Sequence, residues 1–471
     1  MAFSKETNKM IRTSFLIFIA FSLLFSISCK KEKENPNPPA PPVEDSIYQQ
    51  YGTPFTGIPE TEDIVLYEVN LRAFSSSGDL QGVIERLDEL ADLQVNVLWL
   101  MPIHPVGQVN SVNSPYSVKD YKAVSEEYGT LNDLRALTDG AHARGMAVMM
   151  DWVANHTSWD NDWISNKSWY SQDGNGNIIH PAGTNWLDVA DLNFSNQKMR
   201  EAMIDAMKYW VYEANVDGFR CDYADGVPFD FWKQAIDSVR SIEGREFVFF
   251  AEGARNDHFN AGFDLNFGWQ FYGAIKEVFA GQPVSRIFTA NTNEYASVPA
   301  GKHWVRFTTN HDESAWDATP ISLFNGIDGA LAASAVTIFT GGVPLIYGSQ
   351  EVGTAANIPF FSNSVINWSN NPEMLLTYKK MLQFYADSPT ARKGQNKIYQ
   401  HSDVACFKKE LNGDEVVIIA NLRNVSINYT IPQELRSTQW VEVVTESAVT
   451  LGTQMNMEPY KFLILRKAPS N

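Results

Sequence analysis

Cysteine is scarce in this sequence, with only three residues in 471, at positions 29, 221 and 406. Cys29 belongs to an N-terminal leader, and the other two fall in segments that look like different domains. We therefore expect no structural disulfide, even in an oxidising compartment. A hydrophobic content of 44% is nevertheless enough for a sizeable core.

Positive charge is also in deficit. There are 37 Lys and Arg residues against 55 Asp and Glu, which gives a formal net charge of -18. Nucleic acids and anionic membrane surfaces are bound through basic patches, so this balance argues against both as partners. Aromatic residues, at 13%, are plentiful and suit flat-faced ligands such as sugars, although a large core would also use them.

Long hydrophobic runs are rare, and the most prominent one, SFLIFIAFSLLFSIS at 14–28, is too short for a comfortable membrane span. Basic residues precede it and Cys29 follows it, which resembles a bacterial lipoprotein signal, although Ser26 stands where Leu is usual. We expect a signal peptide over 1–28, with Cys29 as the lipidated first residue of the mature protein. A plain secretory signal is the alternative.

The segment after the leader, 29–54, is rich in proline and charge near its start and reads as a flexible tether. With the lipid on Cys29, it would hold an exported protein to the bacterial membrane, either in the periplasm or at the cell surface.

Eight short apolar runs follow, and most are separated by amphipathic helical patterns. The runs are 64–69, 95–101, 146–151, 216–222, 246–252, 262–267, 304–309 and 343–347. Apolar strands that alternate with helices indicate a parallel sheet covered by helices. Eight such units predict an α/β fold, a (β/α)8 TIM barrel over 55–391. Periodicity alone leaves an open doubly wound sheet as an alternative.

Two regions depart from this repeat. Residues 152–195 follow the third run and form a long stretch rich in tryptophan and turns, which predicts an inserted domain. After 391 the chain turns to short strands without helices, and Asn412-Gly413 between two of them is a hairpin signal. We therefore expect a C-terminal antiparallel β-sandwich over 392–471.

Polar residues end four of the predicted barrel strands. They are Asp151, Arg220 with Asp222, Glu252, and His311 with Asp312. Because the C-terminal ends of barrel strands meet at one rim, these side chains should converge. Arg220 and Asp222 by themselves could be a buried ion pair, but four such endings favour a functional site.

Carboxylates in such a pocket suit the cleavage of an acetal, which needs one protonated acid and one ionised nucleophile. Glu252 ends an apolar run, and burial there would keep it protonated, whereas the guanidinium of Arg220 would keep Asp222 ionised. A metal site is the rival use of clustered carboxylates and histidines. No tight ligand spacing supports it.

Four motifs then resemble, in order, the signature regions of the α-amylase family, glycoside hydrolase family 13. They are DWVANH (151–156), GFRCDYADG (218–226), FAEGA (250–254) and TTNHDE (308–313). Supporting matches are MPIHP (101–105), SPYSVKDY (114–121), VADLN (189–193) and GGVPLIYGSQE (341–351). The resemblance covers about residues 55–390. It implies a TIM barrel with an inserted B domain, and retaining hydrolysis of α-glucosidic bonds in α-glucans or malto-oligosaccharides.

The resemblance also implies roles for single residues. Asp222 matches the nucleophile, Glu252 the general acid/base and Asp312 the stabiliser of the transition state. The other matches are Arg220, which orients the nucleophile; His156 and His311, which hydrogen-bond the sugar in subsite −1; Tyr116, which stacks on that sugar; and Asp151, which supports the site. The two histidines could instead be hydrogen-bonded core residues.

The chain departs from the family pattern after the nucleophile. Many α-amylases have Lys-His there, whereas this chain has Asp225 and Gly226, which puts a starch-type +2 subsite in doubt. Asn155 and Asp191 match side-chain ligands of a structural calcium ion, to which Gly226 could add its backbone carbonyl. Asn155 as a loop cap and Asp191 as a turn residue are the alternatives. No organic cofactor is expected.

Two other functions stay open at this point. A transglycosylase of the same family, such as a branching enzyme or a glucanotransferase, would use the same three acids. A non-catalytic glucan-binding protein is the third reading, but the presence of all three acids and the arginine argues against it.

Overall fold

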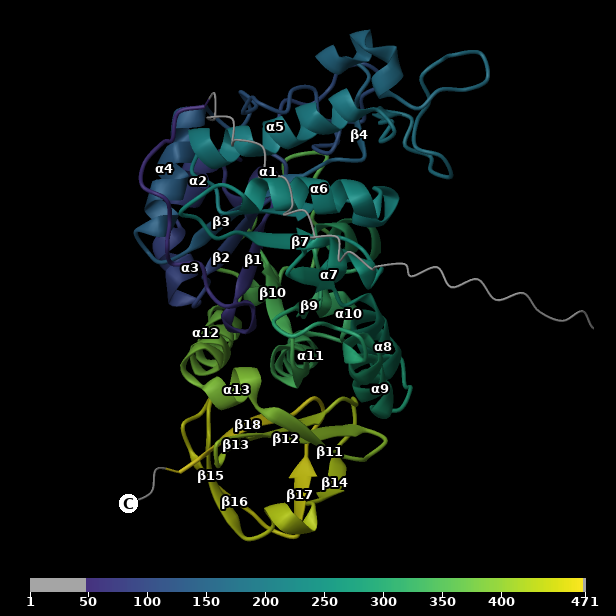
Figure 1. Cartoon of the computed structure of the whole chain (residues 1–471). Coiled ribbons are helices and arrows are strands. Elements are labelled where there is room, and N and C mark those ends of the chain that lie inside the picture. Colours follow the sequence, from purple (N-terminus) through teal and green to yellow (C-terminus); the bar gives the residue numbers. More distant parts are fainter. Residues whose placement is uncertain (1–47, 469–471) are drawn as a thin grey trace, which may run out of the picture. The chain divides into compact units, whose positions relative to one another are not determined.

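A closed barrel of eight parallel strands forms the centre of the molecule (Figure 1). The computed structural model describes residues 48–468. The strands follow one another around the barrel in the order β1-β10-β9-β8-β7-β6-β3-β2. They are β1 (Leu66–Val69), β2 (Val97–Leu100), β3 (Ala147–Trp152), β6 (Gly218–Cys221), β7 (Val248–Ala251), β8 (Leu265–Phe267), β9 (His303–Arg306) and β10 (Val343–Tyr347). The predicted TIM barrel is confirmed, and the open sheet is excluded.

The barrel strands are mostly apolar because both of their faces are covered. Every residue of β1, β2, β3, β6 and β7 is buried. One face fills the barrel interior and the other meets the surrounding helices. Gly218 opens β6 where the next strand comes very close, since a Cβ there would lie 2.0 Å from the carbonyl oxygen of Val248.

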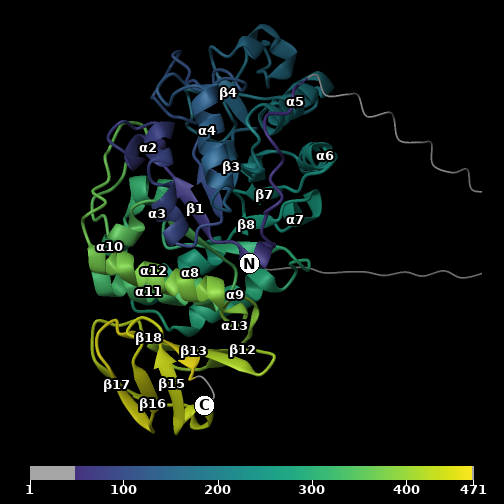
Figure 2. The ribbon, with the colours of Figure 1, turned by 90° about the vertical axis from the view of Figure 1, so that its left-hand side faces the viewer.

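Helices cover the outside of the barrel (Figures 1 and 2). They are α1 (Leu71–Phe74), α2 (Leu80–Ile84), α3 (Leu87–Asp92), α4 (Leu131–His142), α5 (Gln197–Glu213), α6 (Phe229–Arg240), α7 (Asp257–Ala261), α8 (Trp269–Phe279), α9 (Ser285–Tyr295), α10 (Pro320–Leu323), α11 (Ile327–Thr340), α12 (Pro372–Asp387) and α13 (Pro389–Lys393). Local signals set some of their ends. At the start of α4, Thr130 and Asp133 form a capping box.

The segment between β3 and α5 forms the small inserted unit (Figure 1). Its two antiparallel strands are β4 (His156–Ser158) and β5 (Val189–Asp191), with 3-10 turns between them. Trp163 and Trp169 meet edge to face, with their ring centroids 5.3 Å apart, and Tyr170 is buried beside them. These aromatic residues join the insertion to the main hydrophobic core of the barrel.

The C-terminal part is antiparallel, as the loss of helical periodicity predicts. Its six-stranded sheet has the order β11-β12-β13-β18-β15-β16, and β14 pairs with β17. The strands are β11 (Gln395–Tyr399), β12 (Val404–Leu411), β13 (Asp414–Asn421), β14 (Ile427–Thr430), β15 (Thr438–Glu442), β16 (Ala448–Leu451), β17 (Gln454–Met457) and β18 (Phe462–Lys467). Side chains of both sheets share a separate apolar core. At the predicted hairpin, Asn412 and Gly413 both have positive φ, as a type I′ turn requires.

The C-terminal sheet packs directly on the outer helices of the barrel. Helix α11 is buried along almost its whole length and lies against β13 and β18. Phe288 of α9 meets Phe407 of β12 with ring centroids 5.7 Å apart. Cys406 in β12 is buried and free, as is Cys221 in β6.

The end of the predicted tether lies on the barrel surface, which corrects part of the tether prediction. The hydroxyl of Tyr51 donates a hydrogen bond to Asp139 at 2.6 Å, and its backbone N–H donates to the carbonyl of Tyr212 at 2.7 Å. The signal peptide, Cys29 and the tether up to residue 47 lie outside the described residues. Within 48–468, no helix has both the length and the apolar character needed to cross a membrane.

Candidate active site

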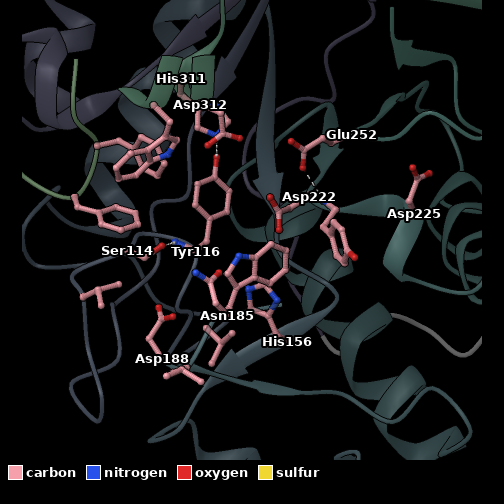
Figure 3. Close-up of a pocket in the computed structure, with 18 of the residues that line it drawn as sticks. Ser114, Tyr116, His156, Asn185, Asp188, Asp222, Asp225, Glu252, His311 and Asp312 are labelled. Atoms are coloured by element: carbon pink, nitrogen blue, oxygen red, sulfur yellow. Dashed lines mark hydrogen bonds and ion pairs between the residues drawn. The ribbon is translucent and has the colours of Figure 1, made fainter. Parts of the chain in front are cut away.

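A cavity of about 810 Å³ lies at the C-terminal ends of the barrel strands (Figure 3). Loops after six of the strands supply its walls, together with the insertion. The lining residues from the predicted site are Tyr116, His156, Asp222, Glu252, His311 and Asp312. All three predicted catalytic carboxylates therefore face one cavity, as sequence reasoning from the strand ends expected.

Arg220 is the centre of this site and is fully buried. Its Nη1 donates to both carboxylate oxygens of Asp151, at 2.8 and 3.1 Å, and to Oδ1 of Asp222 at 3.1 Å. Its Nη2 lies 2.9 Å from Oε1 of Glu252. Barrel register explains the meeting, because β6 lies between β3 and β7, so that Arg220 is flanked by Asp151 and Phe250. One guanidinium thus holds three carboxylates.

The shared guanidinium changes the expected protonation of the site. Burial raises the pKa of Asp222 well above its ordinary range, the charge of Glu252 raises it further, and Arg220 offsets only part of this. Arg220 therefore favours the ionised form of Asp222, as the sequence predicts, while burial opposes it. Asp222 and Glu252 both contact this one guanidinium, which fixes their positions relative to each other.

Asp151 supports the site from below and is itself buried. Besides Arg220, its Oδ2 accepts hydrogen bonds from Nε1 of Trp99 and from the hydroxyl of Tyr116, both at 3.1 Å. The Arg220 guanidinium also lies 4.9 Å from the centre of the Trp99 ring. These contacts fix both the arginine and the tyrosine ring that borders the cavity.

His311 carries a positive charge at neutral pH. Its Nδ1 lies 2.5 Å from Oε1 of Glu68, and its Nε2 lies 2.8 Å from the Tyr116 hydroxyl and 3.5 Å from Oδ2 of Asp312. Burial lowers the pKa of His311, but the charges of Asp312 and Glu68 outweigh it and raise the pKa to about 9. Both ring nitrogens are then donors.

His156 differs from His311 in its charge. Burial lowers its pKa to about 4, so the ring is neutral. Nδ2 of Asn155 lies 3.3 Å from its Nδ1. If Nδ1 accepts this hydrogen bond, the ring proton sits on Nε2. The site thus combines one charged and one neutral histidine.

The turn after Asp222 is strained. Tyr223 has φ 42° and ψ 46°, in the left-handed region that non-glycine residues rarely adopt. This conformation lets its backbone N–H donate to Oε2 of Glu252 at 2.8 Å. Gly226 leaves room for the Tyr223 ring, since a Cβ there would lie 2.2 Å from the ring. The strain therefore places a donor on the predicted acid.

Asp225, three residues after Asp222, serves the neighbouring loop. Its Oδ1 lies 2.7 Å from Nε2 of the buried His258, and its Oδ2 accepts the backbone N–H of Ala254 at 3.0 Å. Asp225 lines the cavity, but these contacts use its carboxylate to fix the chain after Glu252.

The predicted calcium ligands lie close together in the insertion. His156, next to Asn155, pairs with Asp191 across β4 and β5, and the carbonyl of Asn155 accepts the backbone N–H of Leu192 at 3.2 Å. Among residues 48–468, no group of three or more His, Cys, Asp or Glu side chains is arranged to hold a metal ion. A cation here would therefore depend on amide and backbone oxygens as well.

Sequence reasoning missed several residues of the site. Glu68 and Trp99 both point into the barrel centre, and strand alternation from their neighbours offered a signal for each. The cavity wall also includes Trp186, Trp316 and Phe360. Trp186 and Phe360 lie in loops and Trp316 in a single helical turn, where no periodicity marks a side chain that faces a cavity.

Comparison with known proteins agrees with this geometry. The family model for the α-amylase catalytic domain matches residues 48–177 and 183–395, the greater part of the chain. This chain belongs to the α-amylase family. It is 24% identical to Alpha-amylase 3 of Dictyoglomus thermophilum over 487 aligned residues, which cover 87% of this chain and 94% of that protein.

Other family members are similarly related. A cyclomaltodextrinase of Thermoanaerobacter pseudethanolicus is 26% identical over 73% of this chain and 63% of that protein. The crystal structure of an α-amylase from Lactobacillus plantarum superposes with a TM-score of 0.76 at 25% identity, covering 87% of this chain and 100% of that one. The chain is thus an α-amylase-family glycosidase with the family fold.

Replacing Glu68 with glutamine should lower the pKa of His311, because it removes one of the two charges that raise it. The stabilising contribution of the charged ring is complete below its ordinary pKa of about 6.5 and is lost as the pH rises through about 9. In the variant this loss should occur at lower pH, by roughly one unit or more. NMR titration of ¹⁵N-histidine measures it.

The matched control is Glu313→Gln. The Glu313 carboxylate accepts a hydrogen bond from Tyr272 at 2.8 Å and should affect His311 far less. An unchanged His311 titration in Glu68→Gln would contradict the assigned ion pair.

Proposed function

We propose that this protein hydrolyses α-glucosidic bonds in α-glucans or malto-oligosaccharides by double displacement, with retention at the anomeric carbon. One observation carries the proposal: Asp222 and Glu252 share a single buried guanidinium at the floor of a cavity that is large enough to hold part of a glucan chain. A nucleophile and an acid must stand side by side in this way to act on one bond.

In the first step, Glu252 protonates the glycosidic oxygen while Asp222 attacks the anomeric carbon. The bond to the leaving sugar breaks, and a glycosyl ester forms on Asp222. In the second step, Glu252 takes a proton from water, whose oxygen attacks the same carbon and frees Asp222. The hydrogen bond from the Tyr223 backbone and the nearby Arg220 hold Glu252 in place for both steps.

The charges around the site favour an oxocarbenium-like transition state. The sugar ring gains positive charge as the bond breaks, and the carboxylates of Asp222 and Asp312 face it from the cavity wall. His311, as a cation between Glu68 and Asp312, is a donor for sugar hydroxyl groups. The Tyr116 ring, stacked near His311 at 5.4 Å, borders the same space.

The Asp222→Asn variant should lose turnover by about four orders of magnitude or more, because it lacks the nucleophile but keeps its shape. Binding of maltoheptaose should survive in isothermal titration. Asp237→Asn, on the exposed face of α6, is the control and should keep wild-type activity. Early products of the wild type should have the α configuration by NMR.

The same assay separates the competing functions. Products longer than maltoheptaose would favour the transglycosylase, and binding by the wild type without any cleavage would favour the glucan-binding protein. Full turnover by Asp222→Asn would overturn the assignment of the nucleophile.

We further propose a structural calcium ion held by Asn155 and Asp191, with the backbone carbonyl of Gly226. These oxygen donors fit the preference of calcium. A Cβ at residue 226 would lie 2.8 Å from Oδ1 of Asn155, so only glycine leaves that oxygen open. Asp191 is partly buried and makes no ion pair with the basic side chains of residues 48–468. When bound, the ion would neutralise Asp191 and tie the insertion to the turn after Asp222.

Chelation by EDTA should therefore lower the melting temperature of the wild type, and added calcium should restore it. The variant Asn155→Ala should melt at a lower temperature and respond little to EDTA. Metal analysis provides the second readout. A wild-type protein that contains no calcium and melts alike with and without EDTA would refute this site.

We also infer from the sequence that the enzyme is exported and held to the bacterial membrane through a lipid on Cys29. The support is the apolar run 14–28, the cysteine directly after it and the proline-rich segment that follows. The membrane is thus proposed as a partner by lipid insertion, and not by surface charge.

Labelling with a fatty-acid probe tests the anchor. The full-length protein should carry the label and sediment with membranes, and Cys29→Ser should lose both properties. A Cys406→Ser variant is the control, because that thiol is buried in β12. Release of unlabelled wild-type protein into the medium would favour the plain secretory signal.

A further inference from the structure

Large apolar side chains are exposed around the mouth of the cavity. Trp316 is 64% exposed, Leu187 63% and Val112 52%, and all three line the cavity. Exposure of a whole indole to water is unfavourable, and a group of exposed apolar residues at a cleft marks a binding surface. Trp316 is the largest of the three and comes only four residues after Asp312.

The position of Trp316 is fixed by its surroundings. It lies in a single π-helical turn, Glu313–Asp317, and such turns are frequent at functional sites. Lys276 forms ion pairs with Glu313 and Asp317 at the two ends of this turn. The side chain of Asn357 also donates to the carbonyl of Ala315 at 3.2 Å. An exposed side chain on a fixed turn is prepared for contact with a ligand.

Two phenylalanines pack against the indole with their rings nearly perpendicular to it. Phe360 and Phe361 lie 5.8 and 5.4 Å from Trp316 between ring centroids, at interplanar angles of 77° and 73°. Phe360 in turn meets the ring of His311 at 5.1 Å. The aromatic cluster is thus continuous with the catalytic residues. Because Trp316 stays 64% exposed despite these contacts, much of the indole surface is available for stacking on the apolar face of a sugar.

A second aromatic wall stands on the side of the acid. Trp186 meets Tyr223 at 4.9 Å between ring centroids, and the Tyr223 backbone holds Glu252. Figure 3 shows Glu252 and Asp225 to one side of Asp222, and His311 and Asp312 to the other. The leaving sugar must lie towards Glu252, which protonates it. The retained part of the chain therefore extends past Asp312, towards Trp316.

We propose that Trp316 is a stacking platform for a sugar unit on the retained, non-reducing side of the cleaved bond, and that it sets the length of the product. The occupant is the substrate α-glucan itself, because the platform continues from the cavity that holds its reacting bond. This inference rests on the proposed function and names a specificity-determining residue of the same site.

The test uses Trp316→Ala with two substrates. On maltoheptaose labelled at its reducing end, kcat/KM should fall about tenfold, a loss of about 1.4 kcal/mol of stacking. The labelled products should also become longer, because fewer units bind on the non-reducing side. On α-glucosyl fluoride, which fills only the subsite next to Asp222, the rate should stay within about twofold of the wild type.

Two further variants keep the test specific. Trp316→Phe retains a flat ring and should restore most of the wild-type product pattern. Val425→Ala changes an equally exposed apolar residue far along the chain, which is 60% exposed, and should behave as the wild type. A merely structural role for Trp316 would lower the rates on both substrates together.

The outcomes separate this inference from the proposed function. If the wild type cleaves maltoheptaose and Trp316→Ala gives the same products at the same rate, the platform is refuted and the function stands. If the wild type cleaves neither substrate, the proposed function itself fails.

Discussion

The buried guanidinium of Arg220 is the interaction on which the site depends. A charge taken wholly out of water is costly unless it is paired and hydrogen-bonded. Arg220 donates hydrogen bonds to Asp151 and Asp222 and forms an ion pair with Glu252. The same contacts set the positions of the nucleophile and the acid relative to each other. Burial and the charge of Glu252 raise the pKa of Asp222, and the contact with Arg220 lowers it.

A second set of charges joins distant parts of the barrel. Glu68 lies within β1, whereas His311 follows β9, and β10 lies between these two strands. Their contact through the barrel centre continues by way of Tyr116 to Asp151 and so to Arg220. The floor of the cavity is thus one hydrogen-bonded network, in which each group fixes the protonation of the next.

The walls of the cavity are built differently from its floor. Strand ends provide the charged floor, while loops and the insertion provide aromatic side chains on two sides, one near Glu252 and one near Asp312. A rigid barrel that carries variable loops allows the chemistry to stay constant while the loops select the length and shape of the glucan.

Local sequence patterns were enough to predict the barrel, the insertion and the antiparallel C-terminal part. They also predicted which carboxylates face the cavity. Apolar runs that alternate with helical patterns and end in polar residues mark the barrel strands, and the Asn412-Gly413 turn is specified by two adjacent residues. The four motifs at strand ends carried the resemblance to the α-amylase family for the same reason. Only the tertiary structure showed that three carboxylates share Arg220 and that Glu68 raises the pKa of His311. It also showed that residues 48–54 lie on the barrel and that Trp316 borders the cavity. These facts depend on which side chains meet across strand register and loop paths, and residues far apart in the chain carry no local signal of such meetings.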